Sequence, residues 1–151
     1  MKISIATIFV SLFLFAVSCG TPQGKPTDLG NACAPENEKQ YLEVSGYIVP
    51  RSSVFCSNIG GGRLECGFDF SDSAGGEKKM SAEIEQGSGA NTVDKLPSGY
   101  KKEDIKIRDN GGNPIALTDK VKVTGKMSIA PAAPGGQGVC FMQVEKIEGA
   151  K

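Results

Sequence analysis

Residues 119–129 read Asp-Lys-Val-Lys-Val-Thr-Gly-Lys-Met-Ser-Ile, and apolar side chains alternate there with polar ones. Successive side chains of a β-strand point to opposite faces of a sheet, so this period of two predicts a half-buried strand. Its inward face carries Val121, Val123, Met127 and Ile129. A loop rich in Pro and Gly follows at residues 130–138 and is expected to turn the chain back.

The segment 139–147 alternates in the same way and is predicted to be the last strand. Its inward side chains are Cys140, Met142 and Val144, and Ile147 is out of step with them. A β-bulge adds one residue to a strand and shifts the alternation that follows it. The sequence therefore predicts an antiparallel pair of strands with a bulge near its end.

Earlier parts of the chain repeat this period of two. Strands are predicted at about residues 42–48, 64–70 and 80–84, with shorter ones near residues 54–56 and 105–107. The strongest turn signals are Gly60-Gly61-Gly62, Gly75-Gly76 and Asp109-Asn110-Gly111-Gly112-Asn113. No segment has a sustained 3.6-residue period, so we expect a mainly β domain.

The pattern Val-x-Val-x-Gly at residues 121–125, together with the closing strand at 139–147, resembles the last two strands of an OB-fold. The resemblance extends over about residues 41–148 and implies a small Greek-key, OB-like barrel of five to six strands. An immunoglobulin-like sandwich is the alternative. That fold has about seven strands, and the sequence provides fewer.

The N-terminus has the features of a secretory signal. Met1-Lys2 precedes an apolar run from Ile3 to Val17, and small residues end the run. This run of about 15 residues is shorter than the roughly 20 that a transmembrane helix needs. Residues 1–18 are therefore predicted to be a signal peptide that is cleaved off.

Residues 16–19, Ala-Val-Ser-Cys, resemble the lipobox of bacterial lipoproteins. The resemblance implies that Cys19 becomes the N-terminus, carries acyl chains such as palmitate, and anchors the protein in a membrane of the bacterial cell envelope. The residue after Cys19 is Gly20 and not an aspartate, which resembles the sorting signal of an outer-membrane lipoprotein more than that of an inner-membrane one. The alternative is an ordinary signal peptide with a chance cysteine near its end.

The remainder of the chain is predicted to be a tether and one domain. Residues 19–31 are rich in Gly and Pro with few apolar side chains, which is typical of a flexible tether. Removal of 18 of the 151 residues leaves 133, a length that suits a single folded unit. We expect this unit to occupy residues 32–151.

Four cysteines follow Cys19, an even number in a chain expected to reach an oxidising compartment, and this predicts two disulfides. Cys56 and Cys66 flank the triple glycine, so we expect them to be joined across one hairpin. Cys33 and Cys140 are then paired by elimination. Their bridge would hold the N-terminal segment to the last strand.

The chain has no histidine and no Cys-x-x-Cys pair, which removes the usual zinc sites and the His-activated nucleophiles. Ser98 and Lys101 match a Ser-x-x-Lys pattern, but no companion motif accompanies it. Residues 109–113 have glycine at position 111, where a calcium loop needs an oxygen ligand, and no glutamate closes the site, so they are predicted to be a turn. We therefore predict no catalytic residue, no cofactor and no metal site.

Carboxylate pairs are the remaining candidates for chemistry. Glu83 and Glu85 are two residues apart on one predicted strand, and Asp69 and Asp72 are near the end of another. Paired carboxylates are typical of glycoside hydrolases, but solvated strand faces carry the same residues. We expect the protein not to be an enzyme, with a carboxylate-based hydrolase as a remote alternative.

The charges are balanced, with 17 basic and 17 acidic side chains, so nucleic acid is not an expected partner. The final strands nevertheless carry a possible ligand face of lysines: Lys120, Lys122, Lys126 and Lys146. Such a stripe is suited to a small anionic or saccharide ligand, although lysines also protect exposed strands from aggregation.

These observations predict a membrane-anchored envelope lipoprotein whose domain is a non-enzymatic binding or scaffold module. The lipid at Cys19 gives the membrane contact, and an envelope protein is the expected partner. The alternative is a binder of small anionic or saccharide ligands on the barrel face.

Overall fold

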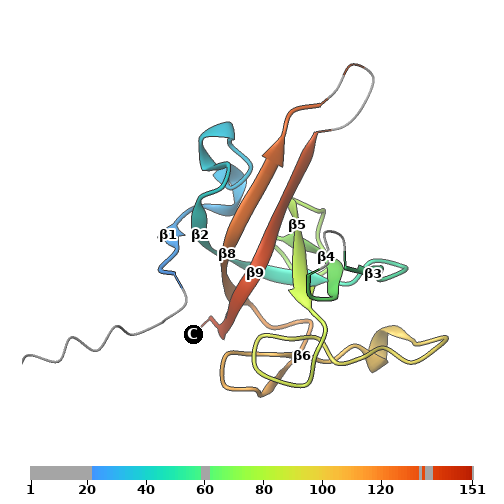
Figure 1. The fold of residues 1–151 in the computed structure, drawn as a ribbon. Helices are drawn as coiled ribbons and strands as arrows, with labels where there is room; N and C mark the ends of the chain where they lie inside the picture. Colours follow the sequence, from blue (N-terminus) through green and yellow to red (C-terminus); the bar gives the residue numbers. More distant parts are fainter. Residues whose placement is uncertain (1–21, 59–61, 133, 135–137, 151) are drawn as a thin grey trace, which may run out of the picture.

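The strands form where apolar and polar residues alternate, as the period of two predicted. The computed structural model describes residues 22–58, 62–132, 134 and 138–150. Its long strands are β2 (Tyr41–Val49), β4 (Glu65–Ser71), β5 (Met80–Glu85), β8 (Val121–Ala130) and β9 (Val139–Gly149). Its short elements are β1 (Lys25–Pro26), η1 (Leu29–Asn31), η2 (Pro35–Asn37), β3 (Cys56–Ser57), η3 (Lys102–Asp104), β6 (Ile107–Arg108) and β7 (Pro114–Ile115). Figure 1 shows β8 and β9 as a long hairpin that rises above the other strands.

The five long strands close into a barrel in the order β2–β4–β5–β9–β8, and β8 pairs back to β2. All neighbours are antiparallel except β5 and β9, which run parallel. Residues 41–46 of β2 pair with β8 and residues 47–49 pair with β4, so β2 belongs to both sides of the barrel. This is a small Greek-key, OB-like barrel, and the predicted fold class is confirmed.

The barrel interior is filled by every second residue of these strands. Fully buried side chains include Leu42, Val44, Phe68, Phe70, Ile84, Val123, Met127 and Met142. Gly46 lies where β2 changes partners, and a Cβ there would overlap the Phe70 ring and the Ser71 carbonyl oxygen. The close approach that closes the barrel therefore depends on a residue without a side chain.

The predicted bulge lies in β9. Thr124 is opposite Lys146, whereas Gly125 is opposite Val144, so Glu145 is the extra residue. This shift returns Ile147 to the interior, where it is fully buried. The bulge explains why Ile147 is out of step in the sequence.

Residues 86–120 form an excursion from the barrel between β5 and β8, drawn at the bottom of Figure 1. Val93, Ile105 and Ile107 of this segment are buried in the core. The predicted strand near residues 105–107 appears as β6, which pairs with β7. Asp109 accepts hydrogen bonds from the backbone of Gly111 and Asn113 at 2.8 Å each, so residues 109–113 form the predicted turn.

Part of the segment that was predicted to be a tether packs against the barrel. β1 pairs in parallel with β2, Gly24 is packed against the backbone of Leu42, and Leu29 is buried. The Asp28 carboxylate also accepts a hydrogen bond from the Gly30 amide at 2.8 Å, at the start of η1. The domain therefore includes residues 24–31, because a short extended segment gains backbone hydrogen bonds at the β2 edge. The predicted signal and Cys19 lie outside the described residues.

Both predicted disulfides are confirmed. Cys56 is directly opposite Cys66 in the β3–β4 pair, and their Cα atoms are 3.9 Å apart. Cys33 is bonded to Cys140, with Cα atoms 5.8 Å apart. Among residues that the structure describes, no helix is long and apolar enough to span a membrane.

Candidate functional site

A groove of about 590 Å³ lies on the outer surface of the barrel, across β4, β5, β9 and β8. Strand register builds its floor, because outward residues of neighbouring strands form rows across the sheet. Glu83 is opposite Gly67 on one side and Gln143 on the other, and Gln143 is opposite Lys126. Phe141 is likewise flanked by Ser81 and Ser128.

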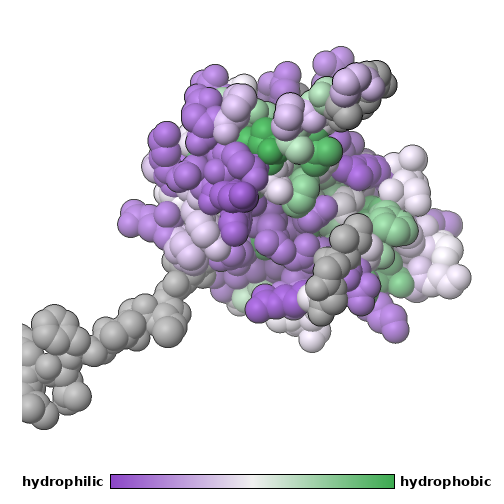
Figure 2. Space-filling model, turned by 45° about the horizontal axis from the view of Figure 1, so that its top comes forward, coloured by the Kyte–Doolittle hydropathy of each residue, from purple (hydrophilic) through white to green (hydrophobic). Residues whose placement is uncertain are grey.

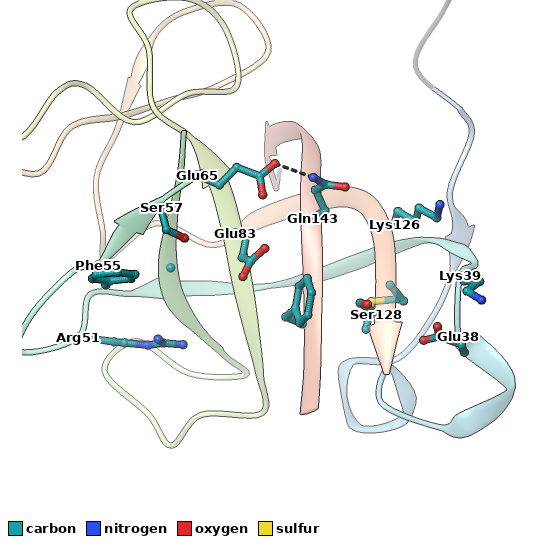
Figure 3. Close-up of a pocket in the computed structure, with 13 residues that line it drawn as sticks. Glu38, Lys39, Arg51, Phe55, Ser57, Glu65, Glu83, Lys126, Ser128 and Gln143 are labelled. Carbon is teal, nitrogen blue, oxygen red and sulfur yellow. Dashed lines mark hydrogen bonds between the residues drawn. The ribbon is translucent and has the colours of Figure 1, made fainter. Parts of the chain in front are cut away.

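Two carboxylates occupy the middle of this groove. Glu65 of β4 and Glu83 of β5 are half-buried and lie near each other on the floor of the groove. The side-chain amide of Gln143 donates a hydrogen bond to Glu65 Oε1 at 2.6 Å, as the dashed line in Figure 3 marks. Desolvation, followed by the negative charge and the hydrogen bond of Glu65, raises the pKa of Glu83, while the charge of Arg51 partly opposes the rise. The surroundings of Glu83 thus favour its protonated form more than water does.

Arg51 lies beside the pair but is bonded elsewhere. Its Nε donates to Asp69 Oδ1 and its Nη2 donates to Ser81 Oγ, both at 2.8 Å. The guanidinium lies over Gly67, whose missing side chain leaves space for it. Arg51 therefore forms one wall of the groove without an ion pair to Glu83.

The rim of the groove is partly apolar. Phe55 is 71% exposed, Val139 is 48% exposed, and both lie in or beside the loops that frame the groove. The face shown in Figure 2 is mostly hydrophilic, with small separate apolar areas. A second hollow of about 320 Å³ continues past Glu83 and Phe141 toward Val139. The site thus combines aromatic edges with a polar floor.

Two acidic side chains lie at the middle of the groove, and basic side chains lie on either side of them. Figure 3 shows Phe55 and Arg51 on one side of the carboxylates, and Lys126 and Lys39 on the other. The nearby Glu38 carboxylate accepts a hydrogen bond from the Ile129 amide, so Glu38 is held by the backbone of β8.

The predicted lysine face is divided by the fold. Lys122 Nζ lies 3.3 Å from both Glu43 and Glu148, and Lys146 Nζ lies 2.9 Å from Glu148. Hydrogen bonds to Glu43 and Glu148 raise the pKa of Lys122. Lys126 lines the groove, whereas Lys120 lines a separate hollow near β1. The four lysines therefore do not form one continuous free stripe.

Three of the four carboxylates considered as pairs from the sequence are bound to cations. Glu85 is paired with Arg63 at 2.8 Å, Asp69 with Arg51 at 2.8 Å, and Asp72 with Lys79 at 3.4 Å. Glu83 lies instead near Glu65 of the neighbouring strand, diagonally across the β4–β5 pair, because the residue directly opposite Glu65 is Glu85. Alternation alone places both side chains outward, but only the β4–β5 register makes them neighbours.

Sequence reasoning also missed Arg51 and Gln143 as parts of a site. Arg51 lies in an irregular segment after β2, and Gln143 is one of many polar residues on outward strand faces. Phe55 and Phe141 were recognisable only as aromatic residues outside the predicted core. Among the described residues no cluster of three or more potential metal ligands occurs.

The groove was also compared with known proteins through the sequence of the whole chain. No protein-family model matches the chain, and no curated protein matches it.

Proposed function

We propose that this protein is a lipid-anchored lipoprotein of the bacterial envelope whose barrel is a non-enzymatic module that binds another protein. The groove over β4, β5, β9 and β8 is the proposed binding surface. The observation that carries this proposal is the exposed Phe55 ring beside a concave row of polar side chains. OB-folds bind oligonucleotides and oligosaccharides on the face of their second and third strands, together with the adjoining loops. The second and third barrel strands correspond here to β4 and β5, which carry the groove.

The composition of the groove favours a protein partner. Protein interfaces are enriched in aromatic residues and Arg at their centres and carry a polar rim. Phe55, Phe141 and Arg51 provide such groups, and the apolar side chain of Val139 extends the surface beyond the groove. The open surface and the run of hydrogen-bonding groups are suited to an extended segment of a partner.

The geometry of the carboxylates argues for binding over hydrolysis. Glycosidases hold their two carboxyl groups about 5–10 Å apart, so that a sugar or a water fits between them. The Gln143 side-chain amide already donates to Glu65 Oε1 at 2.6 Å, so one oxygen of the two carboxylates is bound within the protein. A carboxylate held in this way is better suited to recognition than to acid and base catalysis.

A saccharide ligand is the second candidate. Aromatic rings, the Gln143 amide, the Ser57 and Ser128 hydroxyls and the carboxylates are all groups that can bind sugar hydroxyls, and they line one groove. One result distinguishes this candidate from the first. A glycan ligand would bind the purified barrel in the absence of any partner protein.

The envelope location rests on the sequence features of residues 1–20. Mass spectrometry of the mature N-terminus tests it directly. We expect a diacylated or triacylated Cys19, and an unmodified chain that begins elsewhere would contradict the anchor.

The binding surface is tested by photo-crosslinking in intact cells. A photoreactive phenylalanine at position 55 should capture one discrete envelope protein. The same probe at Lys106, an exposed position in the excursion, should not capture it. Equal capture from both positions, or no adduct from position 55, would exclude the groove as the binding surface.

A further inference from the structure

We infer that the groove receives a lysine or arginine side chain of the partner protein, held between Glu65 and Glu83 and beside the Phe141 ring. This inference rests on the proposed function and names the chemistry of the occupant. It follows from a comparison of the acidic residues on the outer surface of the barrel.

Most outward acidic side chains of the barrel strands are neutralised within the chain. Glu43 and Glu148 are paired with Lys122, Asp69 with Arg51, and Glu85 with Arg63. Within the described part of the chain, no ion pair within 4.0 Å involves Glu65 or Glu83. The central carboxylates of the groove therefore differ from their neighbours on the same two strands.

The nearest cation cannot fill this role without losing its own partners. Arg51 already donates to Asp69 and Ser81, and its charge lowers the pKa of Glu83 by less than burial and Glu65 raise it. Gln143 satisfies one oxygen of Glu65, which fixes that carboxylate toward the groove. The negative charge of the pair is thus incompletely balanced by the protein itself.

An incoming cation would complete this site. It favours the ionised form of Glu83, whose pKa is raised by burial and by the neighbouring Glu65 carboxylate. The Phe141 ring, on the floor of the same groove, offers an apolar and electron-rich surface for the side chain that carries the cation. Two carboxylates beside an aromatic ring thus match the stem and the head of lysine or arginine.

The same charges define where the basic residue goes. Lys39 and Lys126 lie toward the β8 side of the groove and repel a cation there, whereas Glu65 and Glu83 attract it at the centre. The hollow that continues from the groove past Phe141 toward Val139 leaves space for the residues that flank the basic one. Charge complementarity of this kind sets the register of a bound segment.

The test uses four short peptides that differ only at one central residue, which is lysine, arginine, glutamine or glutamate, and that are otherwise uncharged. Each peptide is titrated into the full mature domain. Binding is followed by NMR through the Gln143 side-chain amide. We expect the lysine and arginine peptides to bind about tenfold more tightly than the other two, and added salt to weaken them. Equal binding of the glutamine peptide, or no binding of the basic peptides at millimolar concentration, would overturn the inference.

Matched variants give the control. Glu83→Gln and Glu65→Gln should each weaken the basic peptides about tenfold, because each removes one charge while keeping the shape. Glu85→Gln, on the same strand as Glu83, should leave binding unchanged because Glu85 is paired with Arg63. Equal losses for Glu83→Gln and Glu85→Gln would contradict the assigned site.

Crosslinking separates this inference from the proposed function. If position 55 captures a protein partner and Glu83→Gln does not weaken its binding, the groove binds protein, but the inference that it receives a basic side chain is wrong. If position 55 captures nothing, the proposed function itself fails.

Discussion

Gly125 is a point where two strands approach too closely for any side chain. A Cβ on this residue would overlap the carbonyl oxygen of Gln143, directly beside the bulge at Glu145. Glycine is required here by space, because the residue is buried and its backbone belongs to a regular strand. The final glycine of the Val-x-Val-x-Gly pattern thus has a defined structural cause.

We expect Gly125→Ala to lower the free energy of unfolding by about 1–3 kcal/mol, because the strands must separate to admit the methyl group. Urea unfolding followed by circular dichroism measures the loss. Gly149→Ala is the matched control, since nothing lies within 4 Å of a Cβ at Gly149 near the end of the same β8–β9 pair. A similar loss in both variants would refute the steric explanation.

Glu83 provides a pH prediction. Its pKa is raised by desolvation and by Glu65, so the folded state retains a proton that the unfolded state has released. The stability that this group contributes is present below its ordinary pKa of 4.5 and is lost as pH rises through the higher folded pKa. At neutral pH, Glu83 therefore opposes folding.

Glu83→Gln should be as stable as the native chain or up to about 1 kcal/mol more stable at pH 7, and this advantage should disappear near pH 4. Urea unfolding at both pH values measures the difference. Glu85→Gln should instead be neutral or slightly less stable at pH 7, because it loses an exposed ion pair with Arg63. A clear loss of stability in Glu83→Gln at pH 7 would contradict the assigned environment.

The two disulfides constrain elements of different kinds. The Cys56–Cys66 bridge joins adjacent strands with a sequence separation of 10, whereas the Cys33–Cys140 bridge joins distant segments with a separation of 107. Loop-closure entropy increases with separation, so the longer loop should give more stability. The N-terminal segment has further support, because Leu29 and Ala32 are buried in the core.

Replacement of Cys56 and Cys66 by Ser should cost about 2–3 kcal/mol, and replacement of Cys33 and Cys140 about 4–5 kcal/mol. In the second variant, hydrogen exchange should still protect the Thr27 amide, which donates to the Glu43 carbonyl at 2.9 Å. Thermal unfolding and exchange measured on the same samples test both points. Loss of that protection would mean that the bridge alone holds the N-terminal segment.

The docking of β1 limits how far the whole barrel can be from its proposed anchor. In the proposed mature protein, only the residues from Cys19 to Gly24 precede the contact with Leu42, and an extended residue spans about 3.5 Å. The barrel surface should therefore lie within about 20 Å of Cys19, the proposed lipid-bearing residue. A free tether through residue 31 would allow more than twice this reach.

Energy transfer from a fluorophore at Lys106 to acceptor lipids in vesicles measures this distance. Gly24→Val should lower the transfer, because its side chain would overlap the backbone of Leu42 and release β1. Gly62→Ala, where a Cβ contacts nothing, should leave it unchanged. Equal transfer in the native and Gly24→Val proteins would show that β1 does not set the distance.

Local patterns were sufficient for the strands, the bulge near Ile147, the turn at residues 109–113 and both disulfides. Each of these depends on residues near one another in sequence, or on the exclusion of other cysteine pairings. Side-chain alternation is a property of a single strand, so the sequence alone reveals which face is buried. The same alternation, with its glycine at position 125, was enough to predict an OB-like barrel.

Only the tertiary structure decided which outward side chains meet. Register between strands places Lys122 opposite Glu148 and diagonal to Glu43, and it places Glu83 opposite Gln143 and diagonal to Glu65. The docking of residues 24–31 was also hidden, because backbone hydrogen bonds to a strand edge need no particular side chains. Fold class thus followed from apolar periodicity, whereas the groove depends on cross-strand neighbours that no periodicity records.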